Sequence, residues 1–172
     1  MPVERTLTGV ADEHWAGFPR ARPYERTVQI GSGENHWWRA TDAVLRWEIK
    51  TRSGFTVRPA SGSHVRVVSG ADYTLIASVG PLRIREPVRV VSVVETADRC
   101  GFAYRTLPGH PVAGEEAFIV HRTIDGRVWF TLRSLTQPGS GLWRPAFTVV
   151  LLAQRWYRRR YLRAAGGIGG SR

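Results

Sequence analysis

The stretch FAYRTLPGHPVAGEEAF, residues 102–118, holds two prolines, two glycines, a histidine and two adjacent glutamates between aromatic residues. Alternating β-forming runs flank its centre at 100–106 and 116–122 and predict two strands. Proline and glycine interrupt strands and fix turn geometry, so the TLPGHP portion predicts a rigid turn with His110 at its apex. The chain is therefore expected to reverse direction here, inside an antiparallel sheet.

Short runs with period two, separated by turn-forming residues, extend this pattern through residues 48–135. The Asp125-Gly126 pair predicts a hairpin with a type I′ turn. In the last run, three apolar residues at 128, 130 and 132 alternate with Arg127, Trp129, Thr131 and Arg133, which predicts one covered face and one solvent-facing face. The other expected strands span residues 24–30, 55–57, 65–69, 73–79, 88–95 and 127–135.

Two segments have helical periodicity. Residues 34–47 place apolar side chains on one face after the first expected strand. A longer helix is expected over 142–164, with an inward stripe formed by Trp143, Phe147, Val150, Leu151, Gln154, Tyr157 and Tyr161. The predicted fold class is α+β: a curved antiparallel sheet wraps the long C-terminal helix in a helix-grip arrangement, with one shorter helix after the first strand.

The bulk composition favours a single soluble domain. The 172 residues predict an irregular segment at 1–20, one domain at 21–165 and a flexible glycine-rich tail at 166–172. The absence of an apolar run of about 20 residues, an N-terminus without the apolar core of a signal peptide, and a single cysteine, Cys100, predict a cytoplasmic protein. The net charge is +11, and Lys50 is the only lysine.

The passage at 89–130, RVVSVVETADRCGFAYRTLPGHPVAGEEAFIVHRTIDGRVWF, resembles the signature of the family called domain of unknown function 1990. Residues 31–47 and the RYLRA sequence at 160–164 also resemble that family, and the likeness covers about residues 20–165. It implies the topology of START-related, birch-allergen-like proteins and assigns no catalytic residues. Arg105 stands where the family usually has glycine, and it is expected to line or narrow a pocket mouth.

Two kinds of side chain in the opening stretch carry chemistry. Glu115 and Glu116 are adjacent on a strand, so they point to opposite faces and cannot act as an acid–base pair. Glu116 shares its face with Phe118 and is the expected inward carboxylate, either an acid or ligand anchor or a structural group. His110 is expected either to pair with Glu116 or Tyr104 at a cavity rim or to hydrogen-bond its own loop.

The leading hypothesis is a domain that binds a small apolar molecule between sheet and helix, with no cofactor, as a monomer or homodimer. Arg105 and His110 are expected near the entrance. The other expected lining residues are Tyr104, Glu116, Phe118, Phe130, Phe147, Leu151, Tyr157 and Tyr161.

Two alternatives belong to other classes. One is an enzyme of cyclase or hydrolase type that uses His110 and Glu116. The other is weak peripheral association with an anionic membrane or nucleic acid, without a specific nucleic-acid partner, through Arg155, Arg159, Arg160 and Arg163. The histidines show no metal-binding spacing, so no metal site is expected.

Overall fold

Seven strands form one antiparallel sheet, in the spatial order β1-β7-β6-β5-β4-β3-β2. The computed structural model describes residues 6–17, 21–62, 66–79, 81–138 and 147–168. The elements in chain order are β1 (Arg22–Ser32), α1 (Glu34–Leu45), α2 (Glu48–Arg52), β2 (Phe55–Pro59), β3 (Asp72–Val79), β4 (Leu82–Glu95), β5 (Arg99–Thr106), β6 (Val112–Arg122), β7 (Arg127–Pro138) and α3 (Phe147–Gly166).

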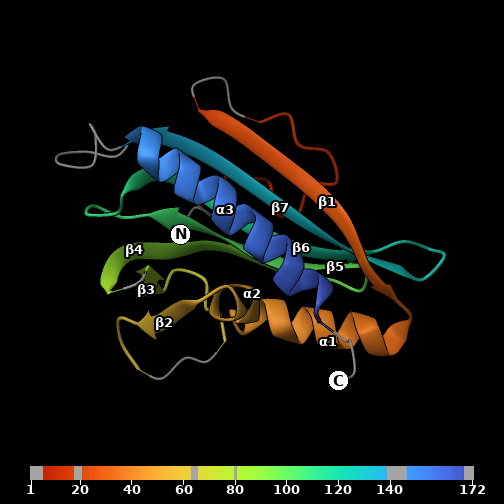
Figure 1. Cartoon of the computed structure of the whole chain (residues 1–172). Coiled ribbons are helices and arrows are strands. Elements are labelled where there is room, and N and C mark those ends of the chain that lie inside the picture. Colours follow the sequence, from red (N-terminus) through yellow and green to blue (C-terminus); the bar gives the residue numbers. More distant parts are fainter. Residues whose placement is uncertain (1–5, 18–20, 63–65, 80, 139–146, 169–172) are drawn as a thin grey trace.

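The helices and the sheet have the arrangement that the sequence predicts. Strands β1 and β2 are the two edges of the sheet, and α1 and α2 connect them along the chain. The helices lie on one face of the sheet, and α3 crosses that face (Figure 1). Register shifts at Gln29/Gly31 in β1 and at Val90/Ser92 in β4 mark β-bulges. Because a bulge bends its strand and increases its twist, these irregularities help the sheet to curve around the helix.

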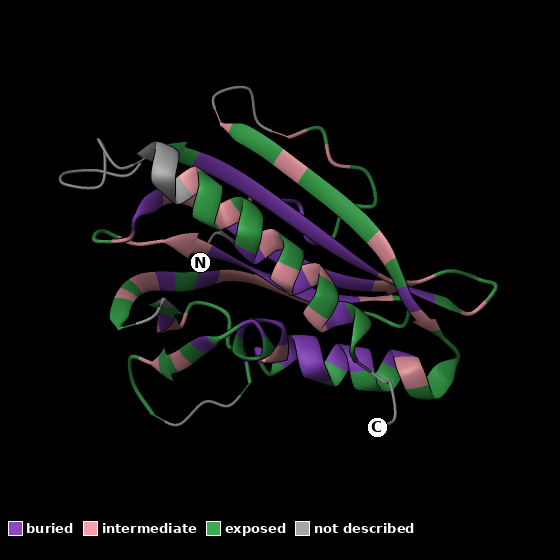
Figure 2. Cartoon of the chain, in the orientation of Figure 1, coloured by how far each residue is buried: buried purple, intermediate pink, exposed green. Residues whose placement is uncertain are grey.

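The main core lies between the sheet and the helices, and the central strands carry most of its buried side chains (Figure 2). Phe118 and Phe130 are fully buried on the inner face, and Trp37 and Val44 of α1 are buried against that core. The apolar stripe expected on the first helix is therefore confirmed. Each large side chain buried in this way contributes about 2 kcal/mol.

The expectation of a solvent-exposed outer face on β7 holds for Arg127 but is wrong for Thr131 and Arg133, which are buried. Residues 6–17 form an irregular segment that covers this face, and Val10 packs there against Ala103, Ala117 and Ile119 in a second small core. Only 2% of Arg133 is exposed beneath the same segment. Strand alternation correctly assigned the side chains to two faces, but it could not show that a distant segment covers the second one.

The helix expected at 34–47 ends early, and a second helix follows. α1 stops at Leu45, Trp47 adopts a left-handed backbone conformation with φ 63°, and α2 occupies residues expected to begin the strand region. This conformation is uncommon for a large residue and is maintained only when the surroundings fix it. The buried Trp47 ring packs 4.6 Å from Phe102 and 4.9 Å from Tyr73.

Other expected boundaries differ in smaller ways. Residues 66–69 do not form the expected strand, whereas residues 63–65 and the expected helix start at Leu142 lie outside the described residues. Ile168, in the segment expected to be a tail, is buried. At the β6–β7 hairpin, Gly126 has φ 78° and donates its N–H to the Thr123 carbonyl, whereas Asp125 has a negative φ. The turn is therefore a type I turn followed by a left-handed glycine rather than type I′.

Gly101→Ala is expected to lower the free energy of unfolding by about 2–3 kcal/mol. A Cβ at this position would lie 2.3 Å from the Phe118 carbonyl oxygen and 2.9 Å from the Ile119 Cα, so β5 and β6 would have to separate. Urea unfolding measures the loss. The matched control is Gly166→Ala, where the added Cβ meets no atom within 4 Å, and a stability equal to or above wild type is expected. Equal losses in the two variants would contradict the close-approach explanation.

Candidate functional site

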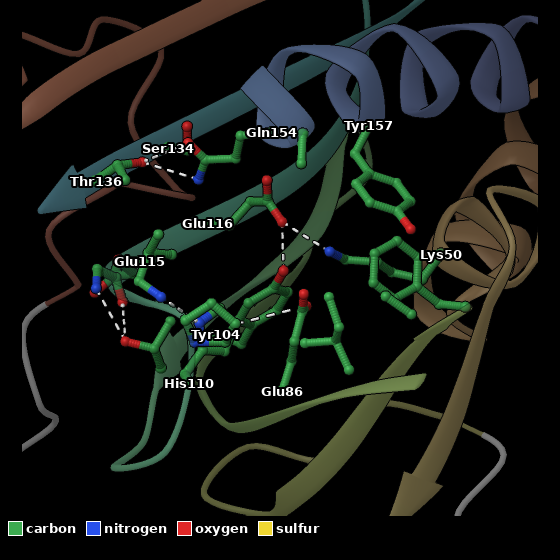
Figure 3. Close-up of a pocket in the computed structure, with 18 of the residues that line it drawn as sticks. Lys50, Glu86, Tyr104, His110, Glu115, Glu116, Ser134, Thr136, Gln154 and Tyr157 are labelled. Carbon is green, nitrogen blue, oxygen red and sulfur yellow. Dashed lines mark hydrogen bonds and ion pairs between the residues drawn. The ribbon is translucent and has the colours of Figure 1, made fainter. Parts of the chain in front are cut away.

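A cavity of about 280 Å³ lies between the inner face of the sheet and α3 (Figure 3). This volume is at the lower end of the range of about 300–1,000 Å³ typical of small-molecule sites. Its walls are mostly apolar, with contributions from Phe55, Ala77, Leu82, Ile84, Val112 and Leu135. Its polar residues include Lys50, Glu86, Tyr104, His110, Glu116, Gln154, Tyr157 and Tyr161.

Lys50 is the centre of the polar wall. The side chain comes from α2, is 2% exposed, and donates to Glu116 Oε2 at 2.9 Å and to the Tyr161 hydroxyl at 2.6 Å. The Tyr104 hydroxyl donates to the same glutamate oxygen through a short hydrogen bond. The network thus joins α2, β5, β6 and α3 around one buried ion pair.

Aromatic rings surround the Lys50 ammonium. Its Nζ lies 4.4 Å from the ring centre of Tyr161, 4.6 Å from Phe55, 5.1 Å from Tyr104 and 5.3 Å from Phe118. The electron-rich ring faces attract a cation, most strongly where water is excluded. They and Glu116 together offset the cost of removing the ammonium from water.

The phenols around this ion pair remain protonated. Burial and the nearby Glu116 carboxylate raise the pKa of Tyr104 and of Tyr161 well above the usual value. Burial also raises the pKa of Tyr157. Among the described residues, the Tyr157 and Tyr161 hydroxyl protons and the third N–H of Lys50 have no acceptor. These donors of the polar wall are therefore available to a bound molecule.

The structure brings together five of the residues that the sequence suggests for a pocket. Tyr104, His110, Glu116, Tyr157 and Tyr161 all line the cavity. Phe118 and Phe130 are fully buried in the core behind the cavity wall instead of lining it, although the Phe118 ring supports the Lys50 ammonium. The side chain of Phe147 lies outside the described residues.

Leu151 and Arg105 are placed elsewhere. Leu151 lines a different hollow, because helix α3 turns it toward the β1 side of the sheet. Arg105 lies on the outer face of β5, where its Nη2 is 3.3 Å from a Glu115 carboxylate oxygen. Its backbone has ordinary strand geometry with no positive φ. Because its side chain does not line the cavity, the expectation of an arginine at the pocket mouth is wrong.

The two adjacent glutamates do point to opposite faces. Glu116 faces the cavity, whereas Glu115 accepts hydrogen bonds from the Thr8 backbone N–H at 2.8 Å and from its hydroxyl at 2.5 Å. Glu115 therefore attaches the N-terminal segment to the sheet. Of the two, Glu116 is the one whose carboxylate reaches the Lys50 ammonium, and Glu86 of β4 is a further carboxylate at the cavity.

His110 is fixed by its own loop and by β4. Its Nδ1 accepts the Val112 N–H at 3.1 Å, which places the ring proton on Nε2, and Nε2 lies 3.6 Å from a Glu86 carboxylate oxygen. No hydrogen bond joins His110 to Glu116 or Tyr104 among the described residues. The rim pairing is therefore not formed.

The arginines expected on the outer side of the last helix are largely in solvent. Arg155, Arg159 and Arg163 are exposed, and the Arg160 guanidinium stacks 4.5 Å from the Trp156 ring centre. Arg155 also lines the hollow that contains Leu151.

Lys50 is the residue that sequence reasoning missed. Its one available signal is that it is the only lysine in a chain with 25 lysine and arginine residues in total. Lysine rather than arginine suits this position because a compact ammonium fits between rings where a planar guanidinium would not.

The described residues contain no group of histidine, cysteine, aspartate or glutamate that could hold a metal ion. The buried Cys100 thiol has its pKa raised to about 12, chiefly by burial, which is typical of a core residue. No helix in the described ranges is long and apolar enough to cross a membrane.

The seven-stranded antiparallel sheet and the long C-terminal helix across it define the fold as a helix-grip fold. Among solved structures, norcoclaurine synthase from Thalictrum flavum, in complex with dopamine and hydroxybenzaldehyde, is similar with a TM-score of 0.58 and 9% identity, over 88% of this chain and 90% of that one. Ginseng major latex-like protein 151 from Panax ginseng has a TM-score of 0.54 and 12% identity, over 87% and 99%.

Sequence comparison gives the family. The chain belongs to the family described as domain of unknown function DUF1990, whose profile matches residues 9–164. A UPF0548 protein of Deinococcus radiodurans is 35% identical over 164 residues, covering 85% of this chain and 79% of that protein.

Proposed function

We propose that the chain binds a small, mostly apolar molecule that carries one hydrogen-bond-accepting oxygen, such as a carbonyl or hydroxyl group. The observation that carries this proposal is the buried Lys50–Glu116 pair: the remaining N–H of Lys50 and the Tyr157 and Tyr161 hydroxyls beside it are available donors in a mostly apolar cavity. The walls would bury the apolar body of the ligand, and the donors would fix its orientation.

The charge at the polar wall favours a neutral ligand over an anionic one. Lys50 and Glu116 already balance each other at 2.9 Å, so an added carboxylate would be buried without a counter-ion. A neutral acceptor oxygen instead satisfies the remaining donors of Lys50, Tyr157 and Tyr161. Burying six methylene-sized groups against the apolar wall would contribute about 5 kcal/mol before the cost of association.

The size of the cavity supports a ligand with about one ring rather than a long lipid. A protein of the same fold holds two small aromatic molecules, dopamine and hydroxybenzaldehyde, which is consistent with a ligand of this size. The enzyme alternative based on His110 and Glu116 has less support, because each of the two side chains is engaged with other partners.

Ala153→Trp is expected to block binding. Ala153 lines the cavity from an exposed position on α3, so an indole there would occupy the ligand volume without disturbing the buried network. Leu152→Trp is the matched control, because Leu152 is the adjacent residue, is 60% exposed and does not line the cavity. Native mass spectrometry of the purified proteins measures any co-purifying molecule, and calorimetric titration with acetophenone, a neutral probe with one ring and one carbonyl oxygen, measures binding.

We expect a bound mass, or saturable probe binding, in wild type and in Leu152→Trp, and an affinity at least about tenfold lower in Ala153→Trp. Wild-type protein that carries no molecule and does not bind the probe saturably would refute the proposal. So would equal probe binding in the two tryptophan variants.

A further inference from the structure

A second hollow, of about 350 Å³, lies between α3 and the β1–β7 edge of the sheet. None of the described residues that line it is acidic. It is lined by Pro23, Thr136, Leu151 and three arginines, Arg22 from β1 and Arg155 and Arg158 from α3.

The three guanidinium groups have no carboxylate partner among the described residues. Arg158 is the most constrained: its Nη2 donates to the Ser134 hydroxyl at 2.8 Å, and its guanidinium lies 4.1 Å from the Tyr24 ring centre. Its Nε is buried and has no hydrogen-bond partner. Burial lowers the pKa of Arg158, although the Glu116 carboxylate opposes that shift.

The two fully buried cations of the described chain have anionic partners: Lys50 pairs with Glu116, and Arg133 pairs with Glu25. The hollow instead gathers three arginines that form no ion pair with a described carboxylate, and it has the charge expected of a site completed by an anion from outside.

We propose that this second hollow is an oxyanion site that binds a phosphate or carboxylate group. Guanidinium forks match the oxygen geometry of both groups and form paired, charge-assisted hydrogen bonds with them. The neighbouring Pro23 and Leu151 add apolar surface, so the anion can be a free ion or the head group of an amphipathic molecule.

The oxyanion site adjoins the apolar cavity. Thr136 lines both hollows, and its hydroxyl accepts a hydrogen bond from Gln154 Nε2 at 3.1 Å. The oxyanion site does not depend on the function proposed above. Apart from Thr136 it uses other side chains, and it binds an anion rather than a neutral group.

The test is a titration of uniformly ¹⁵N-labelled protein, at neutral pH and low ionic strength, with inorganic phosphate and separately with decyl phosphate. Backbone amide and arginine Nε–Hε chemical shifts report where each probe binds. The test variant is Arg22→Gln/Arg155→Gln, which removes two exposed arginines from the hollow and leaves the half-buried Arg158 in place. The control variant is Arg159→Gln/Arg163→Gln, which removes the same charge from exposed positions of α3 outside the hollow.

We expect saturable shifts centred on Arg158 and Leu151, with about tenfold weaker binding in the test variant and less than about threefold change in the control. Saturation by inorganic phosphate identifies a free-anion site. Binding of decyl phosphate at least about tenfold tighter than phosphate identifies the head group of an amphipathic ligand. The proposal is overturned if neither probe saturates, if both variants lose affinity equally, or if decyl phosphate binding survives in the test variant.

Discussion

Lys50→Met is expected to lower the free energy of unfolding by about 3–5 kcal/mol, because it leaves the Glu116 carboxylate buried without its cation. The substitution removes the donor at 2.9 Å from Glu116 and the donor at 2.6 Å from Tyr161, in the centre of the cavity wall. Methionine has nearly the volume of lysine, so the loss reports the charge and the hydrogen bonds rather than a new cavity. Urea unfolding followed by circular dichroism measures it.

The double variant Lys50→Met/Glu116→Leu tests the cause of that loss. With both charges removed, no ion is left buried without a partner, so its stability should exceed that of Lys50→Met alone. Arg52→Met is the matched control, because the Arg52–Glu48 pair on the same short helix is largely exposed and should contribute less than about 1 kcal/mol. A double variant no more stable than Lys50→Met would show that the buried charge is not the source of the loss.

The architecture could be predicted because its signals are local and repeated. Period-two runs bounded by glycine and proline locate β3 to β7, and the helical stripe of α1 carries the residues that are buried in the structure. These patterns depend on chain geometry alone, so one sequence is sufficient to detect them. The break between α1 and α2 was not predicted, because Trp47 has no intrinsic preference for positive φ and its conformation is set by ring contacts with Tyr73 and Phe102.

The candidate site could be predicted only in part. Strand alternation identified Glu116, and helical spacing identified Tyr157 and Tyr161, because each of these residues lies on an element with a regular period. Lys50 lies on a helix of five residues, too short to show a period, and its partners are 66 and 111 residues away in the sequence. Contacts over such separations are decided by tertiary packing, which a single sequence does not encode in any local pattern.

Arg133 makes the largest set of hydrogen bonds to the segment that covers the outer face of the sheet, beside Glu115 and Arg99. Arg133 lies beneath residues 6–17 and donates to the carbonyl oxygens of Gly9 at 2.5 Å, Asp12 at 2.9 Å and Glu13 at 3.1 Å. Its Nε also pairs with Glu25 of β1 at 2.5 Å. An irregular segment forms few backbone-to-backbone hydrogen bonds. The charge-assisted hydrogen bonds from Arg133 replace those that a paired strand would provide.

Arg133→Met is therefore expected to release this segment and to lower the free energy of unfolding by about 3 kcal/mol. Several buried acceptors would lose their donor, and the small core around Val10 would open to water. Hydrogen exchange should show faster exchange at residues 8–12 in native conditions, with the β5 and β6 amides still protected. Arg127→Met is the matched control on the outer face of the same strand, because its partner Asp125 is exposed and a loss below about 1 kcal/mol is expected. Unchanged exchange at residues 8–12 in Arg133→Met would mean that Glu115 and the apolar contacts of Val10 hold the segment without the guanidinium.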